Sequence, residues 1–202
     1  MTQALRLRRL RLRSANVFVS ALTSRVIMIF MSQSGITDPT QEPQWAQWYV
    51  EHLRIMRTVD GITSAERFQT KAPSWPQSLA MYSIRSPEVF VDPYYQKIRG
   101  MGPWLSLIDK RFYQRNLFEG VEQASIMAPE VPADCALVVT DQTQPELAHQ
   151  EPAFEGVTFT WLRAVGLDQS TPYRGISVMP HARALGLPPR ADVALYASTQ
   201  PG

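Results

Sequence analysis

Apolar and polar positions along the first 121 residues predict four strands. The continuous apolar run at residues 26–31 is short and rich in β-branched side chains, which is typical of a buried strand. Residues 62–70 and 79–84 form further strand-like runs bounded by Gly-rich or Pro-rich turns. The alternating pattern of residues 111–118 predicts the fourth strand.

Two helices are expected between these strands. The clearer one covers residues 44–56, where apolar or aromatic side chains recur at the spacing of a single broad helix face: Trp45, Trp48, Tyr49, His52, Leu53 and Met56. Gly61 should end it, because glycine accepts the positive φ of a helix C-cap. The second helix starts at Ser86-Pro87-Glu88, with Ser86 as its cap, and Pro93 should break it.

The order strand, helix, strand, strand, broken helix, strand is the ferredoxin-like βαββαβ pattern of the α+β class. Both helices then lie on one sheet face, so the other face needs cover from a partner chain or from a second copy within the chain. The remaining residues predict strands at 136–140, 157–165 and 192–197, a helical turn at 180–186 and a polar segment with helical potential at 144–154. We interpret them as a shortened, degenerate second ferredoxin-like half; the alternative is a C-terminal extension that pads the first domain.

Composition divides the chain of 202 residues into three parts. Residues 1–24 form a basic tail, residues 25–125 the ferredoxin-like domain, and residues 126–202 the second half or extension. Arginine occupies six of the first 25 positions and no acidic residue does: Arg6, Arg8, Arg9, Arg11, Arg13 and Arg25. The tail is either a targeting presequence or a misassigned start, with translation beginning near Met28 or Met31.

Charge and cysteine content exclude several classes of protein. Without the six tail arginines, the chain has 14 basic residues and 18 acidic ones. The resulting net charge of −4 does not favour binding to the negatively charged backbone of a nucleic acid. No apolar run has transmembrane length. Cys135 is the single cysteine, so the chain has no intrachain disulfide; it fits a reducing, cytoplasmic environment and should pack as a small apolar side chain.

Several short segments resemble the EthD-like branch of the dimeric α/β-barrel superfamily. They are Trp48-Tyr49-Val50-Glu51-His52-Leu53, Val59-Asp60-Gly61-Ile62, Ala65-Glu66-Arg67-Phe68, residues 79–84 and Ser86-Pro87-Glu88-Val89-Phe90. The resemblance covers about half of the chain, from residue 26 to residue 121. The sequence departs from the family at Arg54, where a proline is frequent, and the second half has no Trp-Tyr-x-x-His copy.

The resemblance implies a dimeric α/β barrel, formed by a homodimer or, as the alternative, by a monomeric pseudo-dimer; the reduced second half favours the homodimer. Proteins similar to this one act in the breakdown or tailoring of aromatic, ether or polyketide compounds. Related branches include cofactor-free monooxygenases, isomerases, dehydratases and haem enzymes, so the fold leaves the chemistry open.

His52 is the principal candidate for chemistry. It lies on the apolar face of the first helix, where burial lowers the pKa of an imidazole and keeps it neutral and able to transfer a proton. The structural alternative is a histidine that packs at the core edge and bonds a backbone carbonyl. With the family pattern, Arg67 and Tyr49 are further catalytic candidates, and the expected substrate-binding residues are Trp48, Met56, Tyr82 and Tyr113, with Arg115 as a further pocket candidate.

No cofactor or metal is predicted. His52, His149 and His181 lack metal-ligand spacing, and no nucleotide-binding or serine-hydrolase motif is present. We therefore expect a cofactor-independent enzyme that transfers a proton in an isomerase, dehydratase, decarboxylase or monooxygenase reaction. Its substrate would be a small apolar, aromatic or polyketide-like metabolite. The alternatives are a non-catalytic ligand-binding or accessory protein that uses the same cavity, and a haem-binding barrel.

Overall fold

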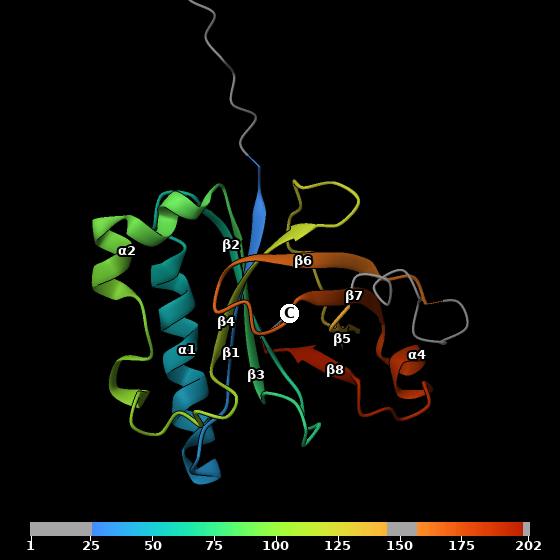
Figure 1. The fold of residues 1–202 in the computed structure, drawn as a ribbon. Coiled ribbons are helices and arrows are strands. Elements are labelled where there is room, and N and C mark those ends of the chain that lie inside the picture. Colours follow the sequence, from blue (N-terminus) through green and yellow to red (C-terminus); the bar gives the residue numbers. More distant parts are fainter. Residues whose placement is uncertain (1–25, 145–156, 200–202) are drawn as a thin grey trace, which may run out of the picture.

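A closed eight-stranded barrel dominates the computed structural model, which describes residues 26–144 and 157–199 (Figure 1). The basic tail, His149 and nearly all of the expected polar segment lie outside the described residues. The strand order around the barrel is β1-β3-β2-β8-β5-β7-β6-β4. Within the described part of the chain, no helix is long and apolar enough to cross a membrane.

The first half has the predicted order of elements. They are β1 (Met28–Ser34), α1 (Glu42–Met56), β2 (Ile62–Gln69), β3 (Ser78–Ile84), α2 (Pro93–Ile98) and β4 (Gln114–Gly120). The predicted second helix is broken at Pro93, with a 3-10 turn before it at Pro87–Val91. Asp92, and not Ser86, supplies the side-chain cap by accepting hydrogen bonds from the backbone N–H groups of Tyr94 and Tyr95.

The fourth strand starts later than the alternation predicted. Asp109 forms a turn in which it accepts hydrogen bonds from the backbone N–H groups of Arg111 and Phe112. That turn removes residues 111–113 from the ladder, and β4 begins at Gln114.

The second half consists of β5 (Cys135–Gln142), β6 (Thr160–Leu167), β7 (Tyr173–Pro180), α4 (His181–Leu185) and β8 (Val193–Ser198). Strand β7 was not predicted, because Arg174 and Gly175 interrupt its apolar pattern. Glycine is required there: a Cβ atom on Gly175 would lie 2.9 Å from Thr140 Cγ2 and 3.0 Å from Phe159 Cδ1. The side chains of Thr140 and Phe159 approach the backbone at position 175 so closely in the folded barrel that glycine fits there best.

The two halves meet at two seams. The four strands of the first half lie in the order β4-β1-β3-β2 and those of the second in the order β8-β5-β7-β6, with antiparallel pairs β2–β8 and β4–β6 joining them. The chain therefore covers the open face of its own first sheet. This is the pseudo-dimer alternative for the barrel; homodimerisation is not needed to close it and stays a prediction.

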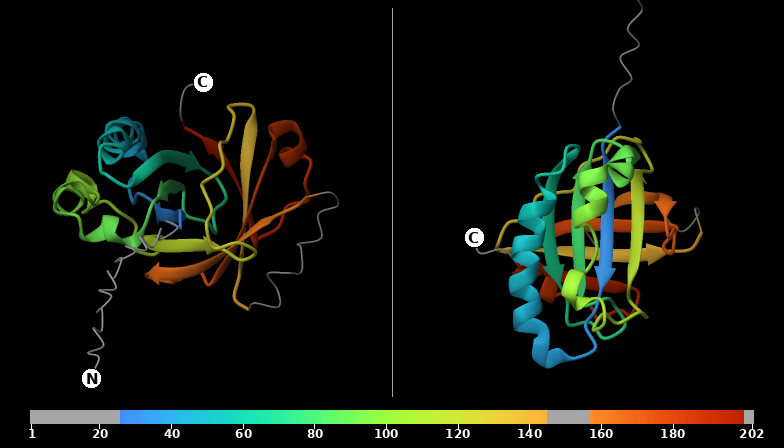
Figure 2. Two further views of the ribbon diagram at one scale, coloured as in Figure 1. Left: turned by 90° about the horizontal axis from the view of Figure 1, so that it is seen from above. Right: turned by 90° about the vertical axis from the view of Figure 1, so that its left-hand side faces the viewer.

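The barrel separates two main apolar cores. Successive side chains of a strand point to opposite faces, so Phe30 of β1 faces the helices while Ile29 and Met31 face the barrel interior. Figure 2 shows α1 and α2 side by side on the outer face of the first-half strands. All seven residues of β1 are buried, because this strand has a core on each side.

Gly61 allows a test of the connection between α1 and β2. Its φ is +92°, and an added Cβ atom would lie 2.6 Å from Val89 Cγ2, whereas Gly100 has φ +96° with nothing within 4 Å. We predict that Gly61→Ala lowers the free energy of unfolding by about 2–3 kcal/mol and Gly100→Ala by about 1 kcal/mol, since both acquire backbone strain but only the first acquires a clash. Urea denaturation measures both values, and equal losses would refute the role of Val89.

Candidate functional site

His52 projects from α1 into an aromatic environment. Its imidazole stacks on Trp48 with ring centroids 4.6 Å apart and planes 13° apart, and meets the edge of Tyr49 at 5.9 Å. These contacts follow from the i, i+4 and i, i+3 spacing on one helix. The imidazole has no hydrogen-bond partner among residues 26–144 and 157–199, so the expected alternative of a backbone carbonyl partner is not observed there.

The environment of His52 keeps its imidazole neutral. Burial lowers the pKa of His52 from 6.5 to about 4, and no carboxylate of residues 26–144 or 157–199 counteracts this shift. At neutral pH the ring therefore carries one N–H and one free lone pair, so it can accept a proton at one nitrogen and donate at the other.

A small cavity of about 40 Å³ lies beside His52. Its walls come from α1, α2, the outer face of the first sheet and the segment between α2 and β4: Phe30, Ser32, Tyr49, His52, Met56, Tyr82, Tyr95, Arg99, Gly100, Met101, Tyr113 and Arg115. The structure thus brings together His52, Tyr49, Met56, Tyr82 and Tyr113 of the predicted site. Trp48 does not line the cavity but supports the imidazole from its other side.

The phenol groups of this cavity are hydrogen-bond donors. Burial raises the pKa of Tyr49, of Tyr82 and of Tyr95, so all three stay protonated. The Tyr49 hydroxyl donates to Met101 Sδ at 3.7 Å, which links α1 to the segment after α2. Tyr82 stacks on Phe30 with ring centroids 5.1 Å apart.

Two arginines supply positive charge at the cavity. Arg115 pairs with Asp168 through Nη2 at 3.2 Å, while its Nε is buried and has no partner within the described residues. Arg99 donates from Nε to Gln96 Oε1 at 2.7 Å. Tyr95 and Arg99 were not predicted as site residues, although their i, i+4 spacing on the expected second helix is a detectable signal.

Arg67 does not line this cavity. Only 1% of its surface is exposed, and its guanidinium lies 4.5 Å from the Trp45 ring and 4.4 Å from the Tyr49 ring. It donates from Nε to Ser78 Oγ at 2.8 Å and pairs with Glu42 through Nη2 at 3.0 Å. Arg67 lies on β2 next to the N-terminal end of α1, where Glu42 is. Its guanidinium is therefore directed toward that end of α1 and contacts the His52 cavity only through the ring of Tyr49.

The described residues offer little support for a metal site, a haem site or a nucleophilic cysteine. Within the described part of the chain, no three His, Cys, Asp or Glu side chains gather as a metal site. As it stands, the cavity of about 40 Å³ beside His52 is too small for a porphyrin and equally too small for most other small molecules. Cys135 is half-buried, and burial raises the pKa of its thiol, which disfavours a nucleophilic thiolate.

No protein-family model and no curated protein matches the sequence. Among solved structures, an anthrone oxidase-like protein superposes with a TM-score of 0.57 at 9% identity, over 87% of this chain and 92% of the other. A proposed monooxygenase from Fusobacterium nucleatum gives 0.53 at 7% identity, over 87% and 93%. A proposed chlorite dismutase gives 0.50 at 8% identity, over 86% and 95%.

These structures define the class of fold. All belong to the dimeric α/β-barrel superfamily, and the present chain has the same fold along most of its length. The resemblance seen in the sequence is thereby confirmed at the level of that shared fold. Identities below 10% carry no information on substrate or reaction.

The lowered pKa of His52 predicts a pH-dependent stability. As pH falls from 6.5 to 4, the unfolded chain binds a proton at His52 that the folded chain does not bind, so the free energy of unfolding decreases. We expect the wild-type protein to lose up to about 3 kcal/mol more than His52→Gln over this range. Urea denaturation at a series of pH values measures the difference, and parallel profiles would contradict a buried neutral imidazole.

Proposed function

We propose that this protein is a cofactor-independent enzyme that moves a proton on a small, largely apolar metabolite at His52. The observation that carries the proposal is the neutral imidazole, without a hydrogen-bond partner in the described structure, at a cavity shared with phenols and guanidinium groups. A structural histidine needs none of these neighbours, whereas proton transfer needs both a base and a way to stabilise the anion it creates.

In this mechanism His52 removes a proton from a carbon next to a carbonyl group of the substrate. The electron pair left behind moves onto the carbonyl oxygen, and the resulting oxyanion accepts hydrogen bonds from Arg115 or Arg99 and from a phenol such as Tyr113. Burial makes His52 a weak base in the free protein, but the negative charge formed on the substrate favours the imidazolium. Return of the proton to a different carbon completes an isomerisation.

The lining also supports an apolar and aromatic substrate. Phe30, Met56 and Tyr82 contribute apolar and aromatic surface to the cavity, and flat rings pack well on such a surface. This agrees with the aromatic or polyketide-like class that the family resemblance implies. Loss of a β-hydroxyl group as water, or reaction with O₂ as the oxidant, can start from the same enolate. Decarboxylation instead produces such an enolate by loss of CO₂, and a protonated His52 would then return a proton to it, so the proposal covers these reaction types as well.

Substrate entry requires the cavity to open. Small-molecule sites measure roughly 300–1,000 Å³, far more than the 40 Å³ present here. The segment from Arg99 to Met101 lines the cavity, and glycines with positive φ stand within and after it, at Gly100 and Gly102. A Cβ atom on Gly100 would have no described atom within 4 Å, so there is free space on that side of the backbone. We expect the segment to move there to admit a substrate, which requires the contact between Tyr49 and the buried Met101 to break.

The alternative function is non-catalytic binding of a small ligand in the same cavity. A carrier of apolar molecules can be lined almost wholly by apolar groups. Here a histidine, several phenols and two arginines converge on a small volume, which favours the enzyme. The two functions differ in whether a bound ligand exchanges protons with solvent.

Hydrogen–deuterium exchange tests the proposal without knowledge of the product. We predict that the protein catalyses exchange at an enolisable C–H of one or more aromatic or polyketide-like ketones in D₂O, followed by NMR. His52→Gln should lower the exchange rate by about 10²–10⁴-fold, the usual contribution of a general base. Glu51→Gln, which changes an exposed α1 side chain paired with Arg54, is the matched control and should leave the rate unchanged.

Equal rates for the wild-type protein and His52→Gln would rule out the mechanism. A ketone that binds without exchange would instead support the ligand-binding alternative.

A further inference from the structure

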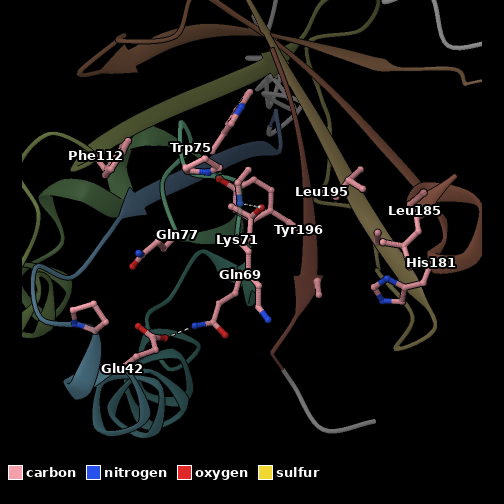
Figure 3. Close-up of a pocket in the computed structure, with 17 residues that line it drawn as sticks. Glu42, Gln69, Lys71, Trp75, Gln77, Phe112, His181, Leu185, Leu195 and Tyr196 are labelled. Atoms are coloured by element: carbon pink, nitrogen blue, oxygen red, sulfur yellow. Dashed lines mark hydrogen bonds between the residues drawn. The ribbon is translucent and has the colours of Figure 1, made fainter. Parts of the chain in front are cut away.

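A second, wider pocket opens at the seam between the two halves of the barrel. Among the described residues, β2 and β8 pair at two positions, Phe68–Ser198 and Gln69–Ala197, with a further bond from Thr199 N–H to the carbonyl oxygen of Arg67, whereas β4 and β6 pair at five. Beyond Gln69 the chain leaves the sheet, and the gap between the two strands becomes a pocket of about 790 Å³ (Figure 3). This volume lies within the range of small-molecule sites.

Each half of the chain supplies one wall. Figure 3 shows Glu42, Gln69 and Gln77 of the first half on one side of the view, Leu185 and His181 of α4 on the other, and Tyr196 and Leu195 of β8 between them. Trp75, Leu195 and several alanines supply further apolar surface. The site exists only because the second half closes against the first.

The pocket is held in shape by hydrogen bonds across the seam. The Tyr196 hydroxyl donates to the carbonyl oxygen of Pro76 at 2.8 Å, and Trp75 Nε1 donates to the carbonyl oxygen of Ala191 at 3.0 Å. These bonds fix the loop after β2 to the second half. A pre-formed pocket loses little conformational entropy when a ligand enters it.

The uncompensated charge in the pocket is positive. Glu42 is neutralised by its ion pair with Arg67 and also accepts a hydrogen bond from Gln69. Lys71 is exposed, and neither its ammonium group nor the imidazole of His181 forms a hydrogen bond or ion pair with another described residue. Both can therefore serve an anionic group.

The mouth of the pocket has apolar surface that the protein leaves uncovered. Leu185 is 78% exposed, the largest fraction among the exposed large apolar side chains of the described structure. Burial of such a side chain by a ligand is favourable. Apolar surface beside the unpaired ammonium group of Lys71 suits a ligand that has an apolar body and one negatively charged group.

We propose that this seam pocket binds an apolar molecule that carries one carboxylate group, separately from the cavity at His52. The carboxylate lies against Lys71, with His181 as a second donor, and the apolar body lies between Trp75 and the side chains of Leu185 and Leu195. The proposal does not depend on the function of His52, since no residue lines both sites.

Titration calorimetry with 2-naphthoate and the neutral 2-naphthylmethanol tests the site. We expect 2-naphthoate to bind one-to-one with a Kd of about 0.1–1 mM, as the usual efficiency of small ligands predicts. The neutral analogue should bind at least about fivefold more weakly, because it does not attract Lys71. His52→Gln should change neither affinity.

Matched variants separate this site from adventitious binding. Lys71→Glu should weaken binding of 2-naphthoate about tenfold or more, while Lys97→Glu, the same charge change on α2 outside the pocket, should have no effect. Ala197→Trp fills the pocket from an exposed strand position and should abolish binding of both compounds. Absence of 2-naphthoate binding, or binding that survives both Lys71→Glu and Ala197→Trp, would overturn the proposal.

Discussion

Burial of the second face of the first sheet is the constraint on which the rest of the structure depends. Strand β1 is buried along its whole length, because α1 and α2 cover one face and the second half of the chain covers the other. The barrel interior draws apolar side chains from both halves, among them Ile29 and Phe68 from the first and Leu137 and Tyr196 from the second. An open sheet would expose these side chains to water, so closure of the barrel stabilises the fold by removing their apolar surface from water.

Both candidate sites follow from this closure in different ways. The His52 cavity lies outside the barrel, where a sheet held rigid from behind positions Tyr82 and Arg115 opposite α1. The seam pocket lies where closure is incomplete, because the paired strands separate after Gln69 of β2 and before Ala197 of β8. The two unequal halves of the chain thus offer one candidate site at a helix–sheet interface and another at the junction between the halves.

Much of the first half could be predicted because its signals are local. The helix face around His52 and the break at Pro93 depend on side chains a few residues apart. The predicted start of β4 was wrong, since the turn at Asp109 overrides the alternation. Strand β7 was missed because a charged residue, Arg174, interrupts its apolar pattern. In the structure Arg174 is buried and forms an ion pair with Asp141 on the neighbouring strand β5, a partner that no local pattern reveals.

The sequence by itself determined the order of elements in the first half, the class of fold and the placing of His52 on an apolar helix face, because these properties repeat with the period of a helix or a strand. Only the tertiary structure decided which side chains meet. It directed Arg67 toward Trp45 and away from the His52 cavity, brought Arg99 and Tyr95 into that cavity, and closed the barrel within one chain. Contacts between distant segments depend on packing in three dimensions, which a one-dimensional pattern does not encode.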